Sequence, residues 1–375
     1  MTGRPGGAVI IDLPAGYRDD PAGKAGLAAL LAAVLSEPRC GGLPARAAAA
    51  GWQSRHRLDE RASSFAFWSH RPSELTSVLH EARRTGLPSG AAGDTLLARL
   101  RQRSVAVLDN RGATPLTLIR PMLEHAAVGT AVNVSLGSAK TMAAVSASDL
   151  TEAAENLLSR AEVYGIGAIP GRRTARAALD PAPPWRGSLE VVDRPASEAQ
   201  VGVRLALRDT PLAVLELMTE VLGNGPDARL HRAVRHNNHL AYGFTALRWH
   251  QPGTASIGAT ATVPPEHVAA AIRVLTTTIR QLADGVGRRE TAMAHWRARS
   301  LLLRACDDPY AEVDEERARV YDQPGPADRL SRMAGFVELP GLSFAPVRPA
   351  VVVIGSLEEQ HHIDVKRAYD EVIGL

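Results

Sequence analysis

The sequence contains only two cysteines, Cys40 and Cys306, in 375 residues. They lie far apart and have no spacing typical of a metal or redox site, so we expect a reducing compartment rather than a disulfide-stabilised fold. No apolar run approaches the roughly 20 residues that a membrane-spanning helix requires. No secretion signal is recognisable in the first residues. These absences predict a cytoplasmic protein without a membrane partner.

Lysine is scarce: Lys24, Lys140 and Lys366 are the only ones, and nearly all positive charge is carried by arginine. The formal net charge is +3, and the arginines are spread along the chain without a basic run that alternates with aromatic residues. Nucleic-acid-binding surfaces usually concentrate such charge, so we expect no nucleic-acid partner. With 45% apolar and 22% charged residues, the composition is that of a globular protein large enough for two domains.

A break in the pattern divides the chain. Prolines and arginines concentrate between Gly171 and Pro195 and are unfavourable to a regular element. We therefore expect an N-terminal domain at 1–175, a linker at 176–195 and a C-terminal domain at 196–375.

The two halves have the same order of elements. In the first, residues 8–13 predict a strand and residues 24–35 an apolar helix; in the second, residues 201–207 and 212–223 do the same. Strand-like runs also close the halves, at 163–169 and 350–356. This repetition predicts an α+β fold of two similar domains, each with helices packed on one sheet face. Further amphipathic helices are expected at 73–86, 95–109, 265–285 and 288–305.

Helix ends can also be predicted. Ser146 and Ser148 precede an amphipathic run and are candidate N-caps. Glu124 and His125 follow an apolar stretch and are interpreted as a helix end.

The stretch from Leu222 to Ala246, LGNGPDARLHRAVRHNNHLAYGFTA, is similar to the second-domain signature of the insulinase/pitrilysin family of zinc peptidases. That signature has a Gly-rich turn, a Ser-Arg-Leu helix, an Arg and, seven residues later, the Tyr of a Gly-Leu-Ala-Tyr strand. Here Ala228 replaces the Ser and His239 replaces the Gly, while Arg235 and Tyr242 keep the spacing. The resemblance implies that each domain has a mainly antiparallel sheet.

A second stretch, from Leu13 to Leu35, resembles the segment that carries the family's His-x-x-Glu-His zinc motif. The gapless alignment places the two histidines on Ala29 and Ala33 and the general-base Glu on Ala32. The family's distant third ligand falls on Asn110, or on Asp109 with a one-residue shift, and an earlier family Glu falls on Arg103.

The resemblance therefore implies that this chain has lost its zinc site. Alanine supplies neither a lone pair for a metal nor a proton acceptor for water, so we expect no metal, no cofactor and no catalytic residue in this chain alone. His236 and His239 could share a metal, but no carboxylate or thiol lies beside them at ligand spacing, and chamber-lining or surface positions are the commoner explanation.

Arg235 and Tyr242 suit a different role. In the family this pair holds the substrate backbone near the scissile carbonyl, and guanidinium and phenol groups are good donors to carbonyl oxygens. We expect a substrate-binding subunit that supplies the pair to a zinc-motif partner, either a different chain or a second copy, for cleavage of unfolded or leader peptides. The alternative is an inert peptide-binding or scaffold subunit, in which Arg235 is a solvated helix charge and Tyr242 a packed aromatic residue.

Overall fold

The computed structural model describes residues 6–14, 16–58, 62–71, 86–88, 90–112, 115–129, 137–165, 184–223, 225–251, 253–308, 310–320 and 324–374. The chain divides into two compact units. Unit 1 comprises Met1–Asn110, Ser135–Ala177 and Arg304–Ala327, and unit 2 comprises Arg111–Val134, Ala178–Leu303 and Asp328–Leu375. The units interleave along the chain, whereas the sequence analysis expected two contiguous domains.

Unit 1 is built on a four-stranded sheet in the order β2-β3-β1-β4, with every neighbouring pair antiparallel. The strands are β1 (Gly7–Leu13), β2 (Gln53–Leu58), β3 (Ser63–Ser69) and β4 (Glu162–Gly165). Successive side chains of a strand point to opposite faces. Val9, Ile11 and Leu13 of β1 accordingly lie in one apolar cluster with Phe65 and Phe67 of β3.

Helices cover this face of the first sheet. Leu30 and Val34 of α1, Leu97 of α4 and Leu150 of α7 complete the cluster. The helical elements of unit 1 are η1 (Tyr17–Asp19), α1 (Leu27–Ser36), η2 (Pro38–Cys40), α2 (Leu43–Ala49), α4 (Ala91–Gly112, which ends at the boundary with unit 2), α6 (Ala139–Ala143), α7 (Ala147–Ser159) and α11 (Ala311–Val320).

Unit 2 is built on a five-stranded sheet in the order β5-β9-β6-β8-β7. Its neighbours are antiparallel except for β5 and β9, which are parallel. The strands are β5 (Leu189–Asp193), β6 (Ala199–Leu207), β7 (Gly243–Gln251), β8 (Thr254–Val263) and β9 (Ala350–Gly355). Both units therefore have the mixed helix-and-sheet architecture, mainly antiparallel, that the sequence predicts.

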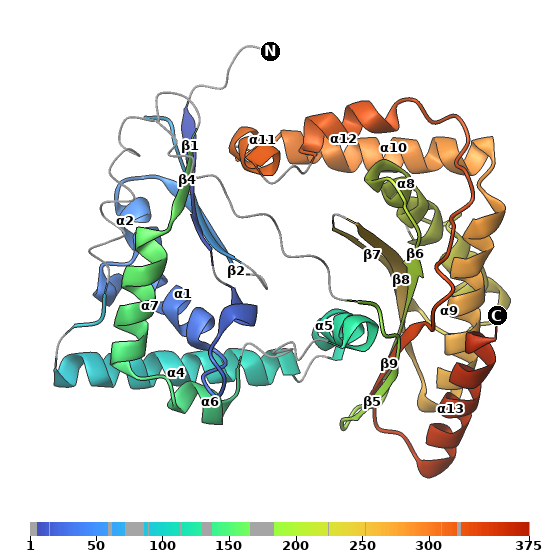
Figure 1. Cartoon of the computed structure of the whole chain (residues 1–375), viewed down its shortest axis with the longest axis horizontal. Coiled ribbons are helices and arrows are strands. Elements are labelled where there is room, and N and C mark those ends of the chain that lie inside the picture. Colours follow the sequence, from blue (N-terminus) through green and yellow to red (C-terminus); the bar gives the residue numbers. More distant parts are fainter. Residues whose placement is uncertain are drawn as a thin grey trace. The chain divides into compact units, whose positions relative to one another are not determined.

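Helices α8, α9 and α13 cover one face of this sheet, where they enclose the larger core of unit 2; Figure 1 shows α9 and α13 side by side along it. The helical elements of unit 2 are α5 (Pro115–Val128), α8 (Leu212–Gly223), η4 (His231–Asn237, a π-helix), η5 (Pro265–His267), α9 (Val268–Arg280), η6 (Gln281–Asp284), α10 (Arg288–Cys306, in unit 2 to Leu303), α12 (Pro326–Met333, in unit 2 from Asp328) and α13 (Glu359–Ile373).

Each sheet also receives one helix on its other face, and that helix comes from the opposite half of the chain. In unit 2, α5 packs Ile119 and Leu123 on Val352 and Ile354, on the side away from α9 and α13 (Figure 1). Gly202 of β6 permits this approach, because a Cβ there would come within 2.9 Å of both α5 side chains. In unit 1, the helix is α11. Tyr310, directly before it, and Val313 within it pack on Ile10, Ala66 and Tyr164.

The predicted strands at 8–13, 201–207 and 350–356 and the predicted helices at 24–35, 95–109, 212–223, 265–285 and 288–305 all form, with shifted ends. Of the strand at 163–169, only the first residues fall in β4, and the helix at 73–86 lies almost entirely outside the described residues. Within the described part of the chain, no helix combines the length and apolar character needed to cross a bilayer.

The linker prediction is wrong at one point, because residues 189–193 form β5. These residues contain no proline, and the edge of β9 offers parallel hydrogen-bond partners that the sequence pattern did not reveal. The capping prediction holds for Ser146, whose Oγ accepts a 3.1 Å hydrogen bond from Asp149 N. It is wrong for Ser148, which lies inside α7 and places its Oγ 2.8 Å from that of Ser146.

Candidate functional site

The candidate site lies on the segment that joins α8 to β7. Gly223 ends α8 where a Cβ would come within 2.2 Å of Ala246 on β7. Gly225 follows with φ +98°, a left-handed conformation that glycine adopts without steric cost. The two glycines therefore permit a tight turn and close packing between helix and strand. The next residues, Ala228 and Leu230, are buried and lead into the π-helix η4.

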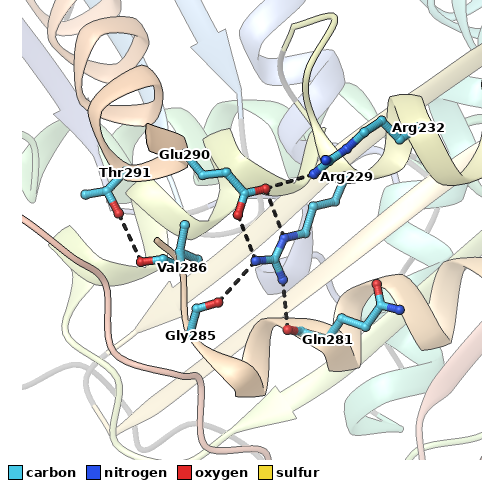
Figure 2. Close-up of polar contacts among 7 residues, drawn as sticks. All are labelled: Arg229, Arg232, Gln281, Gly285, Val286, Glu290 and Thr291. Atoms are coloured by element: carbon cyan, nitrogen blue, oxygen red, sulfur yellow. Dashed lines mark hydrogen bonds and ion pairs between the residues drawn. The ribbon is translucent and has the colours of Figure 1, made fainter. Parts of the chain in front are cut away.

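Arg229 anchors the start of this segment (Figure 2). Its Nη1 donates to the carbonyl oxygen of Gln281 at 2.8 Å, and its Nη2 donates to that of Gly285 at 3.1 Å and to Glu290 Oε2 at 3.0 Å. Arg232, one turn later, donates to Glu290 Oε1 at 2.9 Å. The fixed fork of a guanidinium suits such a set of acceptors, so Arg229 ties the segment to the end of α9 and the start of α10.

Glu290 is the shared acceptor of these two arginines. Its partial burial would raise the pKa of the carboxyl, but the hydrogen bonds and positive charges of Arg229 and Arg232 outweigh burial and lower the pKa below its usual value. The ionised carboxylate therefore holds η4 to α10 at neutral pH. The sequence analysis did not predict this anchor. Arg229 could be recognised as part of the family motif, but its hydrogen-bond acceptors lie 52 to 61 residues further along the chain.

The two predicted substrate-binding residues lie together. Arg235 is on η4 and Tyr242 directly precedes β7, and the guanidinium carbon is 4.1 Å from the centre of the phenol ring, which is a cation–π contact. Tyr242 is 81% exposed, so it is not a packed strand aromatic residue. Among the described residues, no hydrogen bond or ion pair occupies the guanidinium of Arg235. The pair therefore offers unused donors to solvent.

His239 explains how Tyr242 comes to face outward. It is the only non-glycine residue with positive φ in the described chain, at 51°, and it stands where the resembling family has glycine. The turn it makes lets Leu240 N donate to Val234 O at 2.9 Å, so that Leu240 and Ala241 enter the core. Tyr242 follows in the exposed orientation.

Two neighbouring histidines, His231 and His236, belong to a small aromatic group. The ring of His231 lies edge-on to those of His236 and Phe244, with centroids 4.7 and 5.8 Å apart. Burial, and then the positive charges of His236 and Arg235, lower the pKa of His231. Across the part of the chain that the structure describes, no three His, Cys, Asp or Glu side chains converge as metal ligands.

The positions aligned with the zinc motif lie on α1. Ala29 and Ala33 are half-buried against the core of unit 1, and Ala32 is buried. Their methyl groups are compatible with this apolar packing and supply no donor atom, so the residues present do not fit a zinc ion. Asn110 and Asp109 are in α4, but their side chains lie outside what the structure describes; Arg103 is exposed on the same helix. The correspondence of all these positions to zinc ligands stays a prediction.

Part of this chain is similar to a known protein family, and its fold is similar to several solved structures. Residues 139–294 match the family model of the peptidase M16 inactive domain. The fold is similar to a crystal structure of a peptidase M16 inactive domain from Pseudomonas fluorescens, with 17% identity, a TM-score of 0.71 and 94% of each chain covered. A chain of complex III2 from Candida albicans with Inz-5 bound has 12% identity and a TM-score of 0.68, covering 99% of this chain and 95% of that one.

A conserved protein from Enterococcus faecalis V583 is also similar, with 11% identity, a TM-score of 0.68 and 94% of each chain covered. No curated protein matches the sequence. At these identities the solved structures show the fold alone. Together with the family match over residues 139–294, they support the resemblance to the insulinase family.

Proposed function

We propose that this chain is the substrate-binding, non-catalytic subunit of a heterodimeric zinc peptidase. The observation that carries this proposal is the Arg235–Tyr242 pair. The two side chains are in contact, Tyr242 is exposed and Arg235 half-buried, and no described residue uses their hydrogen-bond donors. Such a pair on a chain whose motif positions are alanines makes functional sense when the zinc is supplied by a partner.

Each member of the pair has a definite task in this proposal. The Arg235 guanidinium donates hydrogen bonds to carbonyl oxygens of an extended peptide, and the Tyr242 hydroxyl donates one more close to the bond to be cleaved. Stacking on the phenol ring restrains the guanidinium, which reduces the side-chain entropy lost when peptide binds. The partner's zinc would activate the water, while this chain binds and orients the peptide.

The test combines this chain with a family member that has an intact His-x-x-Glu-His motif, to be sought among the proteins encoded next to it, and uses a panel of unfolded and leader peptides. We expect cleavage only when both proteins are present, and a loss of kcat/KM of at least about 100-fold with the Arg235→Ala, Tyr242→Phe double variant. Arg367→Ala is the matched control, since Arg367 is an exposed arginine of α13, outside η4 and its anchor, that pairs with Asp364. The control should leave kcat/KM unchanged.

Two results would contradict this proposal. If the zinc-motif protein cleaves equally well alone, no subunit of this kind is needed. If the double variant supports full activity, Arg235 and Tyr242 do not act on substrate, and the chain is an inert peptide-binding or scaffold subunit.

A further inference from the structure

The outer face of α10 is unusually apolar. Among the described residues, nine large hydrophobic side chains are exposed, and four of them belong to this helix: Met293, Trp296, Leu301 and Leu303. Trp296 is 67% exposed. Single exposed apolar residues are ordinary, but a group on one element is typical of a surface that contacts another molecule.

Helical spacing separates this surface from the inward face of α10. The buried residues Thr291, Ala294, Ala298 and Leu302 recur three or four positions apart and face the unit 2 core. Met293, Trp296 and Leu303 are three and seven positions apart, which places them on one stripe on the other side. No described element of unit 2 covers Trp296.

Two side-chain-sized cavities accompany this stripe. One, of about 190 Å³, is lined by Arg289, Glu290, Met293 and Arg297 of α10 together with Val221, Asp227, Ala228 and Arg232. The other, of about 230 Å³, is lined by Arg299 and Leu303 of α10 and by Leu330 and Met333 of α12. Trp296 lies between them along the helix. A partner segment that covers Trp296 can therefore place one apolar side chain in each cavity.

The charge around the stripe is mainly positive, although one exposed carboxylate, Asp227, lines the first cavity. Helix α10 contains five arginines and a single acidic residue, Glu290, which is already bound by Arg229 and Arg232. Arg289 and Arg299 are exposed and each lines one of the two cavities. Trp and Arg are the residue types most enriched at the energetic centres of protein interfaces.

We propose that the outer face of α10 is a docking site for an acidic, amphipathic helical segment of a partner protein. Its apolar side chains would cover Trp296 and enter the two cavities, while its carboxylates would pair with Arg289 and Arg299. Discrete cavities favour a protein segment over a lipid surface. This inference is independent of the Arg235–Tyr242 proposal, since it concerns a different surface.

The test measures binding of fluorescent synthetic helices to the full chain by anisotropy. The probe is an amphipathic leucine–glutamate peptide, and the matched peptide has lysine in place of each glutamate. We expect only the acidic peptide to bind and its affinity to fall with added salt. Trp296→Ala should weaken binding at least about 30-fold, and Arg289→Glu with Arg299→Glu should make the lysine peptide the better ligand.

Val337→Ser is the matched control, because Val337 is an equally exposed apolar residue outside α10; it should bind the acidic peptide like the unmodified chain. Circular dichroism verifies that each variant folds. The proposal is overturned if both peptides bind equally, if Trp296→Ala binds as well as the unmodified chain, or if anionic lipid vesicles bind this face while the acidic peptide does not. Self-association abolished by Trp296→Ala would assign the surface to a second copy and also overturn it.

Discussion

Arg204 of β6 and Glu124 of α5 form a buried ion pair inside unit 2, with Nη1 and Oε2 2.8 Å apart although the residues are separated by 80 positions. Arg204 Nε also donates to Ser256 Oγ at 2.8 Å, and its guanidinium lies 4.2 Å from the ring centre of Trp249 and 5.3 Å from that of Trp185. The Arg204 guanidinium is thus hydrogen-bonded, paired with a carboxylate and stacked on two tryptophan rings. The ion pair holds α5 against the sheet.

Removing one partner of this pair should destabilise unit 2 strongly. Glu124→Ala leaves the Arg204 charge buried without its counter-ion, which costs about 3–5 kcal/mol of unfolding free energy. Urea unfolding followed by tryptophan fluorescence measures this loss. The joint replacement Glu124→Leu with Arg204→Met should recover most of it, since an apolar pair of similar size removes both charges together. Equal losses in the single and joint variants would show that the ion pair is not the source of the effect.

The Arg235–Tyr242 pair should matter little for stability. Both single variants, Arg235→Ala and Tyr242→Phe, should change the unfolding free energy by less than about 1 kcal/mol, because an exposed cation–π contact contributes about 0.5–1 kcal/mol. Thermal unfolding of the isolated chain measures this. A loss of several kcal/mol would make the pair a structural element and would remove the basis for reading an activity loss as a substrate contact.

His239→Gly should stabilise the chain. The residue has φ 51°, where a side chain is strained and glycine is not. We expect a gain of about 0.5–1 kcal/mol after the greater freedom of glycine in the unfolded chain is subtracted. His236→Gly is the control: it lies inside η4, where glycine should cost about 1 kcal/mol. If both substitutions destabilise, the turn does not require the left-handed conformation.

Asp149 should make unit 1 sensitive to acid. A hydrogen bond from Lys24 and further bonds from Ser146 lower its pKa from 3.8 to about 2. The folded-state pKa is thus depressed, so the stabilisation is fully present above pH 3.8 and is lost as the pH falls towards 2. The difference in melting temperature between the unmodified chain and Asp149→Asn should therefore be constant near neutral pH and shrink below pH 3.8. A difference that persists at pH 2 would contradict this.

Much of the fold could be predicted because the relevant signals are local. Alternating apolar residues predicted β6, and apolar runs predicted β1, α1 and α8. Three- and four-residue spacing predicted α4, α9 and α10. The N-cap at Ser146 was visible because its partner is three residues away. The strand β5 was not, because its short apolar run becomes a strand only when the edge of β9 lies beside it.

The sequence by itself determined several of the core strands and helices, that the motif positions 29, 32 and 33 are alanines, and that Arg235 and Tyr242 keep the spacing of a family motif. Only the tertiary structure decided that α5 packs in unit 2 and α11 in unit 1, that Arg229 binds Glu290, and that Tyr242 and Trp296 are exposed. The physical reason is that periodicity and capping depend on residues a few positions apart. Burial and pairing depend on which distant segments meet in space.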